Sequence, residues 1–439
     1  MSRPVGFNLI GAASSNTGLG VVTREYAKAL IANGHSVSIF DMEVGGGRSG
    51  LNLSLQDHFA PSLEAMPHDI NIWIIGANGI NHCALKVCRS AHLQTKFNAV
   101  MAWWELPDLP PLWTTSALAF DAIVCASEFV YESWARNVSR TPILLAPAPL
   151  EMPVDITPDR ARFGLPDRAL LIYTGFEAAS DTVRKNPLAA VEAFRRAFPN
   201  DSNVRLVIKV NNPDVEGKLH HSLARLYGLI ENDERVILLR DRLGYRDLLS
   251  LYASCDVIVS LHRSEGLGLM PLEAMRLGRA VVATGWSGNM TYMNYRNAGL
   301  VSYDLVATDE TATHYSPSEL GVASYWAEPS IDHAAAWLRA FAEDETLRLA
   351  VGQQATQDSL SYNELALRTT FGNELAALHQ QRSLTPATNY KQLLERIRIE
   401  VNQDELRRIG IPWRQLAPVW RAVVRQANRH LLWRFQGDR

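Results

Sequence analysis

Two glutamates, Glu265 and Glu273, stand eight positions apart across a glycine-rich turn. The turn contains Gly266 and Gly268 and follows an apolar run, 257–261, that predicts a buried strand. A turn of this kind that opens a helix presents unpaired backbone N–H groups and the positive end of the helix dipole, which together bind phosphate oxygens. An ionised carboxylate only accepts hydrogen bonds, so it suits the hydroxyls of a ribose or another sugar. The spacing therefore predicts a site for a sugar nucleotide.

The turn belongs to a longer stretch, 264–275, that reads SEGLGLMPLEAM. This stretch resembles the E-x7-E signature of family 4 glycosyltransferases, which are retaining enzymes with the GT-B fold. Three further stretches resemble the family in the same order along the chain. Residues 18–39 resemble its opening loop, helix and second strand, 184–187 its phosphate-binding stretch, and 285–290 the loop that closes over the nucleotide diphosphate. The four motifs cover most of residues 5 to 380, which makes the resemblance specific.

The resemblance implies roles for the residues that match these motifs. Glu265 is expected to position the transferred sugar and to stabilise an oxocarbenium-like transition state, while Glu273 faces the same nucleotide from the helix. Lys185 and Arg184 are expected to meet the departing diphosphate, which gains negative charge as the glycosidic bond breaks. The other residues expected to bind the donor are His262, Gly266, Leu267, Gly268, Leu269, Ser287, Gly288 and Asn289.

The basic residues that share the phosphate are only partly specified by the sequence. Family members commonly carry an arginine a few residues before the lysine, but this chain has Phe176 and Glu177 there. Lys209 ends a predicted strand at its carboxyl edge, where open α/β sheets bind ligands, so it is a second candidate for the diphosphate. Its alternative role is to snorkel from the strand end into water.

The first half of the chain also contributes candidates. Gly18 and Gly20 resemble the family's flexible loop, which nears the phosphates and the acceptor when the domains close. Glu105 follows a predicted strand, 97–102, where many family members place a histidine or aspartate that meets the hydroxyls of the donor sugar. We predict that Glu105 takes that place, and a purely structural role is the alternative.

Short apolar strands that alternate with helical segments predict two parallel sheets covered by helices. The expected division is a Rossmann-like acceptor domain over 1–155, a Rossmann-like donor domain over 165–360 and a helix over 361–383 that crosses back to the first domain. Residues 384–439 form a basic helical extension with eleven Lys or Arg against five Asp or Glu. Trp413 and Trp420 recur with other apolar residues at helical spacing, opposite a row of arginines. This pattern predicts either an interfacial helix on an anionic membrane or a helix that packs on the body or on a partner chain.

The composition is that of an ordinary globular protein. The 439 residues are 47% hydrophobic and carry a net charge of −3, so no nucleic-acid partner is expected. The four cysteines lack C-x2-C spacing, and there is no signal peptide and no apolar run of about 20 residues. These features predict a cytoplasmic protein, soluble or peripherally attached to the inner face of the membrane.

The predicted function is transfer of a hexose from a nucleotide diphosphate sugar to a saccharide or lipid-linked saccharide in surface polysaccharide or glycolipid assembly. GDP-mannose is the first choice of donor, by resemblance to mannosyltransferases of such pathways, and a UDP-sugar is the second. No metal and no further cofactor are expected, since the chain has no Asp-x-Asp motif at a suitable strand end. A non-catalytic relative with the same fold is the alternative; an oxidoreductase is disfavoured because no Gly-x-Gly-x-x-Gly follows the first strand.

Overall fold

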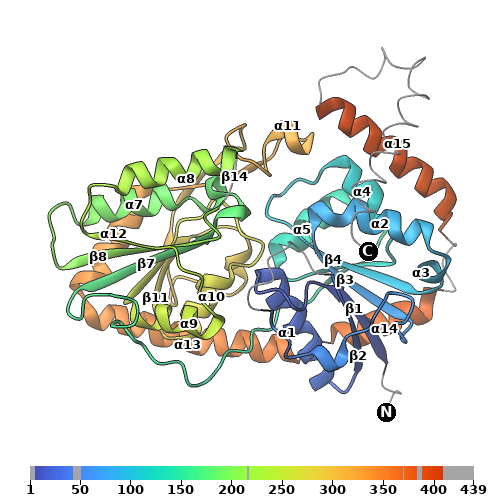
Figure 1. Ribbon diagram of the computed structural model, residues 1–439, viewed down its shortest axis with the longest axis horizontal. Coiled ribbons are helices and arrows are strands. Elements are labelled where there is room, and N and C mark those ends of the chain that lie inside the picture. Colours follow the sequence, from blue (N-terminus) through green and yellow to red (C-terminus); the bar gives the residue numbers. More distant parts are fainter. Residues whose placement is uncertain (1–4, 43–50, 215–216, 369, 383–387, 409–439) are drawn as a thin grey trace.

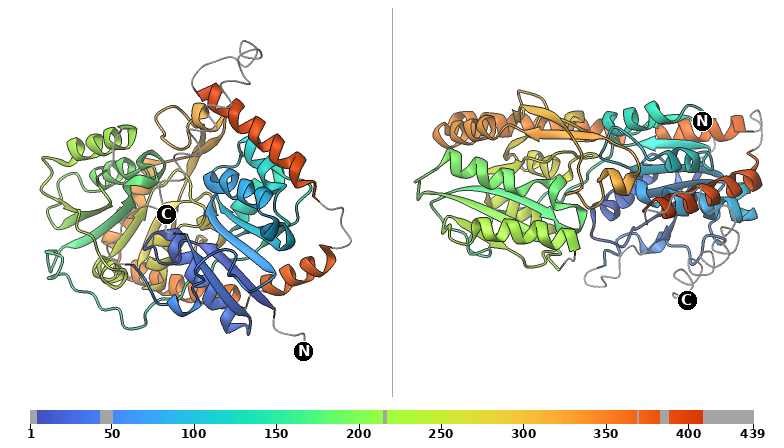
Figure 2. Two further views of the ribbon diagram at one scale, coloured as in Figure 1. Left: turned by 45° about the vertical axis from the view of Figure 1, so that its right-hand side comes forward. Right: turned by 90° about the horizontal axis from the view of Figure 1, so that it is seen from above.

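The computed structural model describes residues 5–42, 51–214, 217–368, 370–382 and 388–408. They form two Rossmann-like domains, each built on a six-stranded parallel sheet with helices on both faces (Figures 1 and 2). The central strands are runs of mostly buried apolar residues, as expected where both faces of a sheet are covered, whereas the edge strands over 143–145 and 236–239 are only partly buried.

The first sheet has the order β2-β1-β3-β4-β5-β6. Its strands are β1 (Gly6–Gly11), β2 (Ser36–Asp41), β3 (Ile70–Gly76), β4 (Phe97–Trp103), β5 (Ala122–Cys125) and β6 (Ile143–Leu145). The helices of this domain are α1 (Gly18–Ala32), α2 (Ile80–Arg89), α3 (Ala91–Thr95), α4 (Pro111–Ala117) and α5 (Glu128–Asn137), with the short turns η1 (Gln56–His58) and η2 (Ala77–Gly79).

The second sheet has the order β12-β11-β10-β7-β8-β9. Its strands are β7 (Leu170–Glu177), β8 (Val204–Asn211), β9 (Val236–Leu239), β10 (Val257–Ser260), β11 (Ala280–Thr284) and β12 (Gly299–Val301). The associated helices are α6 (Thr182–Lys185), α7 (Pro187–Ala197), α8 (Gly217–Ile230), α9 (Tyr245–Ser254), α10 (Leu269–Arg276), α12 (Ile331–Glu343) and α13 (Glu345–Leu367), with turns η3 (Ala178–Ser180) and η4 (Gly288–Thr291).

An antiparallel hairpin, β13 (Tyr303–Ala307) and β14 (Tyr325–Pro329), interrupts the second domain between β12 and α12. Its connection carries the one-turn helix α11 (Pro317–Leu320) and packs against the first domain. The hairpin therefore bridges the two domains on one side of the molecule (Figure 1).

The chain returns to the first domain after α13. The structure forms two helices where the sequence predicts one over 361–383, because α13 ends at Leu367 and α14 (Phe371–Gln381) begins afterwards. The Phe371 ring packs edge-on against Tyr26, 5.6 Å between centroids, so α14 lies on the first domain. Helix α15 (Tyr390–Arg408) follows, and the tryptophans of the predicted interfacial helix fall in 409–439, outside the described residues.

Within the part of the chain that the structure describes, we find no helix long and apolar enough to cross a bilayer. All four cysteines are free thiols and buried.

Candidate active site between the two domains

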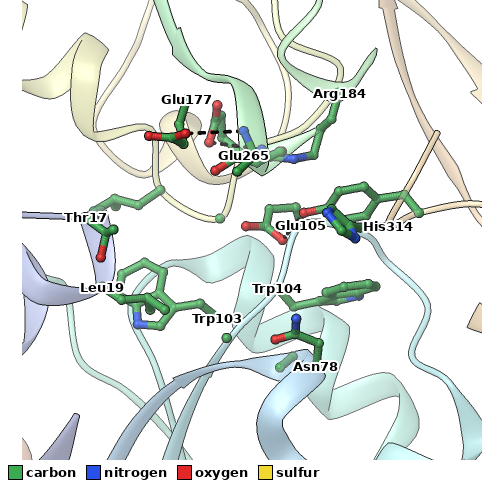
Figure 3. A pocket seen from close by; sticks show the side chains of 18 of the residues that line it. Thr17, Leu19, Asn78, Trp103, Trp104, Glu105, Glu177, Arg184, Glu265 and His314 are labelled. Carbon is green, nitrogen blue, oxygen red and sulfur yellow. Dashed lines mark hydrogen bonds and ion pairs between the residues drawn. The ribbon is translucent and has the colours of Figure 1, made fainter. Parts of the chain in front are cut away.

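A cavity of about 1360 Å³ lies between the domains, where the carboxyl ends of β4 and β7 face each other. Open α/β sheets bind ligands at this edge. The first turn of α1, the chain after β4 and the first turn of α10 all contribute to its wall (Figure 3). The cavity thus collects side chains from both domains.

The glycine-rich turn lies in the wall of this cavity. Gly268 has φ 85° and ψ 67°, a left-handed conformation that glycine adopts without a steric penalty, and it directly precedes α10. A side chain at Gly266 would bring its Cβ within 3.0 Å of the Trp104 carbonyl of the first domain. The two glycines therefore allow the backbone to turn tightly while the other domain approaches.

Two cations converge on Glu265. The Lys185 Nζ lies 2.5 Å from one carboxylate oxygen of Glu265, and the Arg184 Nη1 lies 3.2 Å from the other. Arg184 also donates to the Ser264 carbonyl at 2.7 Å, which ties α6 to the turn. Arg184 and Lys185 thus place two cations at this side of the cavity, among the carboxylates of Glu265, Glu105 and Asp181.

Burial and charge shift the pKa values of this cluster. Burial alone raises the pKa of Glu265, but Lys185 and Arg184 lower it more strongly, to about 2. Burial lowers the pKa of Lys185, and the attraction of Glu265 opposes this effect. Glu265 is thus ionised across the physiological range.

Asp181 fixes the helix that carries the two cations. It is fully buried, has φ 73°, and accepts hydrogen bonds from the backbone N–H groups of Val183 at 2.9 Å and Arg184 at 3.4 Å. Its second oxygen accepts from the N–H groups of Thr313 at 2.6 Å and His314 at 3.0 Å. One carboxylate therefore joins α6 to the interdomain connection of the hairpin.

Glu273 lines the same cavity from α10. It is 5% exposed, and burial raises its pKa to about 7, although the neighbouring Tyr245 hydroxyl acts in the opposite direction. The two predicted glutamates thus reach one cavity, from a turn and from a helix.

Several residues of the predicted donor site lie behind the turn, not in the cavity wall. Ser287 Oγ accepts from the Glu265 N–H at 2.8 Å, and the Gly288 N–H donates to the Glu265 carbonyl at 2.8 Å. Asn289 is buried and donates to the Thr284 carbonyl at 3.0 Å. These residues hold the turn in place, and their contact with a diphosphate stays a prediction.

His262, Lys209 and Gly20 are also absent from the cavity wall. His262 is fully buried, and neither ring nitrogen has a hydrogen-bond partner of good geometry among the described residues. Burial lowers the pKa of His262 to about 4.

Lys209 is buried and donates to the Val210 carbonyl at 3.2 Å and to Asn211 Oδ1 at 2.6 Å, so it does not snorkel. Gly20 leaves no room for a Cβ, which would lie 2.0 Å from the Ser15 carbonyl, whereas Gly18 does line the cavity.

Glu105 enters the cavity from the first domain. Its carboxylate accepts from the Tyr315 hydroxyl at 2.9 Å, and its carbonyl accepts from Ser264 Oγ. Figure 3 shows Glu105 between Trp104 on one side and Arg184 and Glu265 on the other. Neither Tyr315 nor Asp181 was predicted, since both depend on contacts between segments far apart in the sequence and no motif marks either one.

No group of three or more His, Cys, Asp or Glu suited to hold a metal ion occurs among the described residues. Arg184 and Lys185 supply positive charge to the site from the chain itself.

Comparison with known proteins agrees with this architecture. Residues 170–313 match the family model described as glycosyl transferases group 1. A D-inositol 3-phosphate glycosyltransferase of Stackebrandtia nassauensis is 29% identical over 208 residues, and the match spans 44% of each chain.

Solved structures resemble the whole fold at low sequence identity. A glycosyltransferase from Rickettsia africae has a TM-score of 0.62 and 15% identity, with 86% of this chain and 99% of that chain covered. Anabaena HepE in complex with UDP and glucose has a TM-score of 0.57 and 14% identity, covering 85% and 100%. The pneumococcal O-GlcNAc transferase GtfA with UDP and GlcNAc has a TM-score of 0.56 and 12% identity, covering 86% and 99%. The predicted fold is thus confirmed: the chain has the GT-B fold, and its second domain is similar to the group 1 glycosyl transferases over residues 170–313.

Proposed function

We propose that the protein is a retaining glycosyltransferase that moves a hexose from a nucleotide diphosphate sugar to a saccharide or lipid-linked saccharide acceptor. The observation that carries the proposal is the convergence of Arg184 and Lys185 on Glu265, beside the first turn of α10, in a cavity that Glu273 also lines. Cations beside a glycine-rich turn suit a diphosphate leaving group, and carboxylates suit the hydroxyls of a sugar.

In the proposed reaction, Arg184, Lys185 and the backbone N–H groups of the turn stabilise the charge that develops on the departing diphosphate. The ionised Glu265 positions the donor sugar and stabilises positive charge at its anomeric carbon. Glu273 accepts hydrogen bonds from the ribose, and Glu105 accepts them from hydroxyls of the donor sugar. Retention follows same-face attack, in which the leaving phosphate takes the proton of the acceptor hydroxyl; this course is proposed from the family resemblance.

The proposal also concerns which nucleotide and which sugar make up the donor. The resemblance to mannosyltransferases makes GDP-mannose the first choice, whereas two structures of similar fold hold UDP, one with glucose and one with GlcNAc. The proposed setting is assembly of a surface polysaccharide or glycolipid at the inner face of the cytoplasmic membrane.

A thermal-shift panel of GDP, UDP, ADP, their sugar derivatives and NAD tests donor binding. A ligand at 100 times its dissociation constant stabilises the fold by about 2.7 kcal/mol, so the matching nucleotide should raise the unfolding temperature clearly. The shift should be lost in Glu273→Ala. No stabilisation by any nucleotide would contradict the proposal.

Steady-state kinetics of Lys185→Ala test the role of the cations. If Lys185 stabilises the departing diphosphate, its removal should cost about 2–3 kcal/mol of transition-state stabilisation, or about 30- to 160-fold in kcat/KM. The matched control is Arg196→Ala, because Arg196 pairs with Asp332 on the surface of the second domain. Equal kinetics of Lys185→Ala and the control would remove Lys185 from the mechanism.

The alternative is a non-catalytic protein that binds nucleotide sugars. Binding in the panel without any release of nucleoside diphosphate from the sugar nucleotide, with or without acceptors, would favour it.

A further inference from the structure

Helix α6, which carries Arg184 and Lys185, is only four residues long. A helix of about one turn has little stability of its own, so its orientation depends on the contacts around it. Two residues with positive φ frame it, Asp181 at 73° and Asn186 at 52°. Residues other than glycine rarely adopt a positive φ, and such a conformation persists only where the surrounding structure holds it. The position of the two cations is therefore set from outside the helix.

Asp181 ties the amino end of α6 to the connection of the hairpin. Its side chain is fully buried, and its two oxygens accept from four backbone N–H groups, two of α6 and those of Thr313 and His314. The next residue of the connection, Tyr315, packs with first-domain residues in one apolar cluster and donates to Glu105. Asp181 thus links the helix that carries the cations to the segment that docks on the first domain.

Arg263 forms a second link between α6 and the hairpin. Its Nη1 donates to the Val183 carbonyl of α6 at 2.8 Å, and its Nε donates to Glu328 of β14 at 2.6 Å. Both partners of this ion pair are partly exposed, so solvent screening weakens it. Loss of the buried Asp181 acceptor would instead leave buried N–H groups unsatisfied, which costs more. Asp181 is therefore the stronger of the two links.

We propose that Asp181 is a positioning residue for the diphosphate of the donor, which holds Arg184 and Lys185 in place through α6 and makes their placement depend on the hairpin connection. The inference rests on the proposed function, because it assumes that the two cations meet a diphosphate. Asp181 itself does not line the cavity, so it acts through the cations.

Asp181→Asn tests this link with a side chain of nearly the same shape. The amide has one oxygen, so it can accept from α6 or from the connection, while its NH2 group faces N–H donors on the other side. Buried N–H groups then lose their acceptor, and α6 shifts relative to the connection. A misplaced cation should lower the affinity for a diphosphate about tenfold or more, the usual contribution of one hydrogen bond to a charged group.

The experiment is a binding measurement by ligand-observed NMR on the full chain. The probes are three pairs: GDP and guanosine, UDP and uridine, ADP and adenosine. The ratio of the two affinities within a pair reports the contribution of the diphosphate, because the base and the ribose are common to both. Asp181→Asn should lower this ratio at least about tenfold for the pair that binds wild type, with the nucleoside affinity unchanged. A merely structural role would weaken both ligands and leave the ratio as it is.

Asp309→Asn is the matched control, because Asp309 is an exposed residue of the same connection and accepts from the Thr311 N–H within its own turn. It should keep the wild-type ratio. Lys185→Ala adds a test of coupling: the loss in the double variant with Asp181→Asn should be smaller than the product of the two single losses, because Asp181 acts through the cations. If Asp181→Asn is unfolded at the assay temperature, Asp181→Ser replaces it, since serine also caps a helix but its shorter side chain does not span to Thr313.

An unchanged ratio in the Asp181 variant, an equal loss for nucleoside and nucleoside diphosphate, or losses that multiply fully with Lys185→Ala would overturn the proposal. The outcome is separable from that of the proposed function. No binding of any nucleoside diphosphate by wild type would contradict the proposed function and this inference with it. Binding by wild type with an unchanged ratio in the variant would contradict only the role of Asp181.

Discussion

Glu265 and Glu273 are buried carboxylates of one cavity, yet their surroundings shift their pKa values in opposite directions. Two cations hold the pKa of Glu265 at about 2, whereas burial raises the pKa of Glu273 to about 7. Glu265 therefore stays charged, and Glu273 changes its protonation state near neutral pH. Only the second residue is expected to give binding a pH dependence.

We predict that donor binding tightens as pH rises through 7. Hydrogen bonds from a ribose diol favour the ionised form of Glu273, and its ionised fraction rises about tenfold between pH 6 and pH 8. Calorimetric titration with the matching sugar nucleotide should therefore give an affinity about tenfold higher at pH 8, with release of a proton at pH 6. A sugar nucleotide is preferred to the free diphosphate because it has no phosphate that titrates near pH 7.

Glu273→Gln provides the control and a second readout. The raised pKa means that the stability associated with protonated Glu273 is fully present below its usual value of 4.5 and is lost as pH rises through about 7. The difference in stability between the variant and wild type should therefore move in favour of the variant when the pH is raised from 5 to 8. The donor affinity of the variant should no longer depend on pH. A pH dependence equal to that of wild type would show that another group titrates.

Most of the residues that the sequence predicted lie within continuous motifs. Glu265, Lys185 and the 266–269 turn reach the cavity because a strand, a turn and a helix follow one another locally. Asp181 could not be found in this way, since its partner Thr313 lies 132 positions away. The Ser287 to Asn289 loop was found by its motif, but only the folded chain shows that it holds the turn from behind.

At the scale of elements, the contact between the β11–η4 loop and the β10–α10 turn determines the shape of the site. A Cβ at Gly288 would lie 2.2 Å from the Gly266 carbonyl oxygen and 2.6 Å from the Leu267 nitrogen. These are backbone atoms, so no side-chain rotation can relieve the overlap. The strands and helices themselves were predictable from their apolar runs, whereas this backbone contact was not.

We predict that Gly288→Ala displaces the turn and weakens donor binding. The overlap should cost about 1–3 kcal/mol of stability, as overpacking does in a filled interior. Gly228→Ala is the matched control, because a Cβ added to Gly228 of α8 would meet no atom outside its own helix within 4 Å. This control should leave stability unchanged or raise it by about 0.4–1 kcal/mol. Donor affinity and unfolding temperature are measured for both variants, and wild-type behaviour of Gly288→Ala would show that the turn can move.

At the scale of the whole molecule, direct bonds join the two domains around the cavity. Ser127 Oγ donates to the Gly266 carbonyl at 2.6 Å, and Ser324 Oγ donates to Asp108 at 2.8 Å. The Tyr315 ring packs against Trp104, with 5.4 Å between the two ring centroids. The Arg184 guanidinium lies over the same Tyr315 ring, 5.3 Å from its centroid. The structure thus shows the domains in contact at the site, and Tyr315 touches residues of both.

We predict that Tyr315→Ala shifts the domains toward a more open arrangement. Tyr315 is 7% exposed, and removal of its ring should cost about 3 kcal/mol of packing, much of it between the domains. Small-angle X-ray scattering should show a larger radius of gyration for the variant. Saturation with the matching nucleotide should reverse this change, because a ligand at 100 times its dissociation constant contributes about 2.7 kcal/mol. Tyr295→Ala is the matched control because Tyr295 is 78% exposed. Equal radii for the two variants without nucleotide would mean that the remaining bonds suffice to hold the domains together, and Tyr315 would then act only on the position of Glu105.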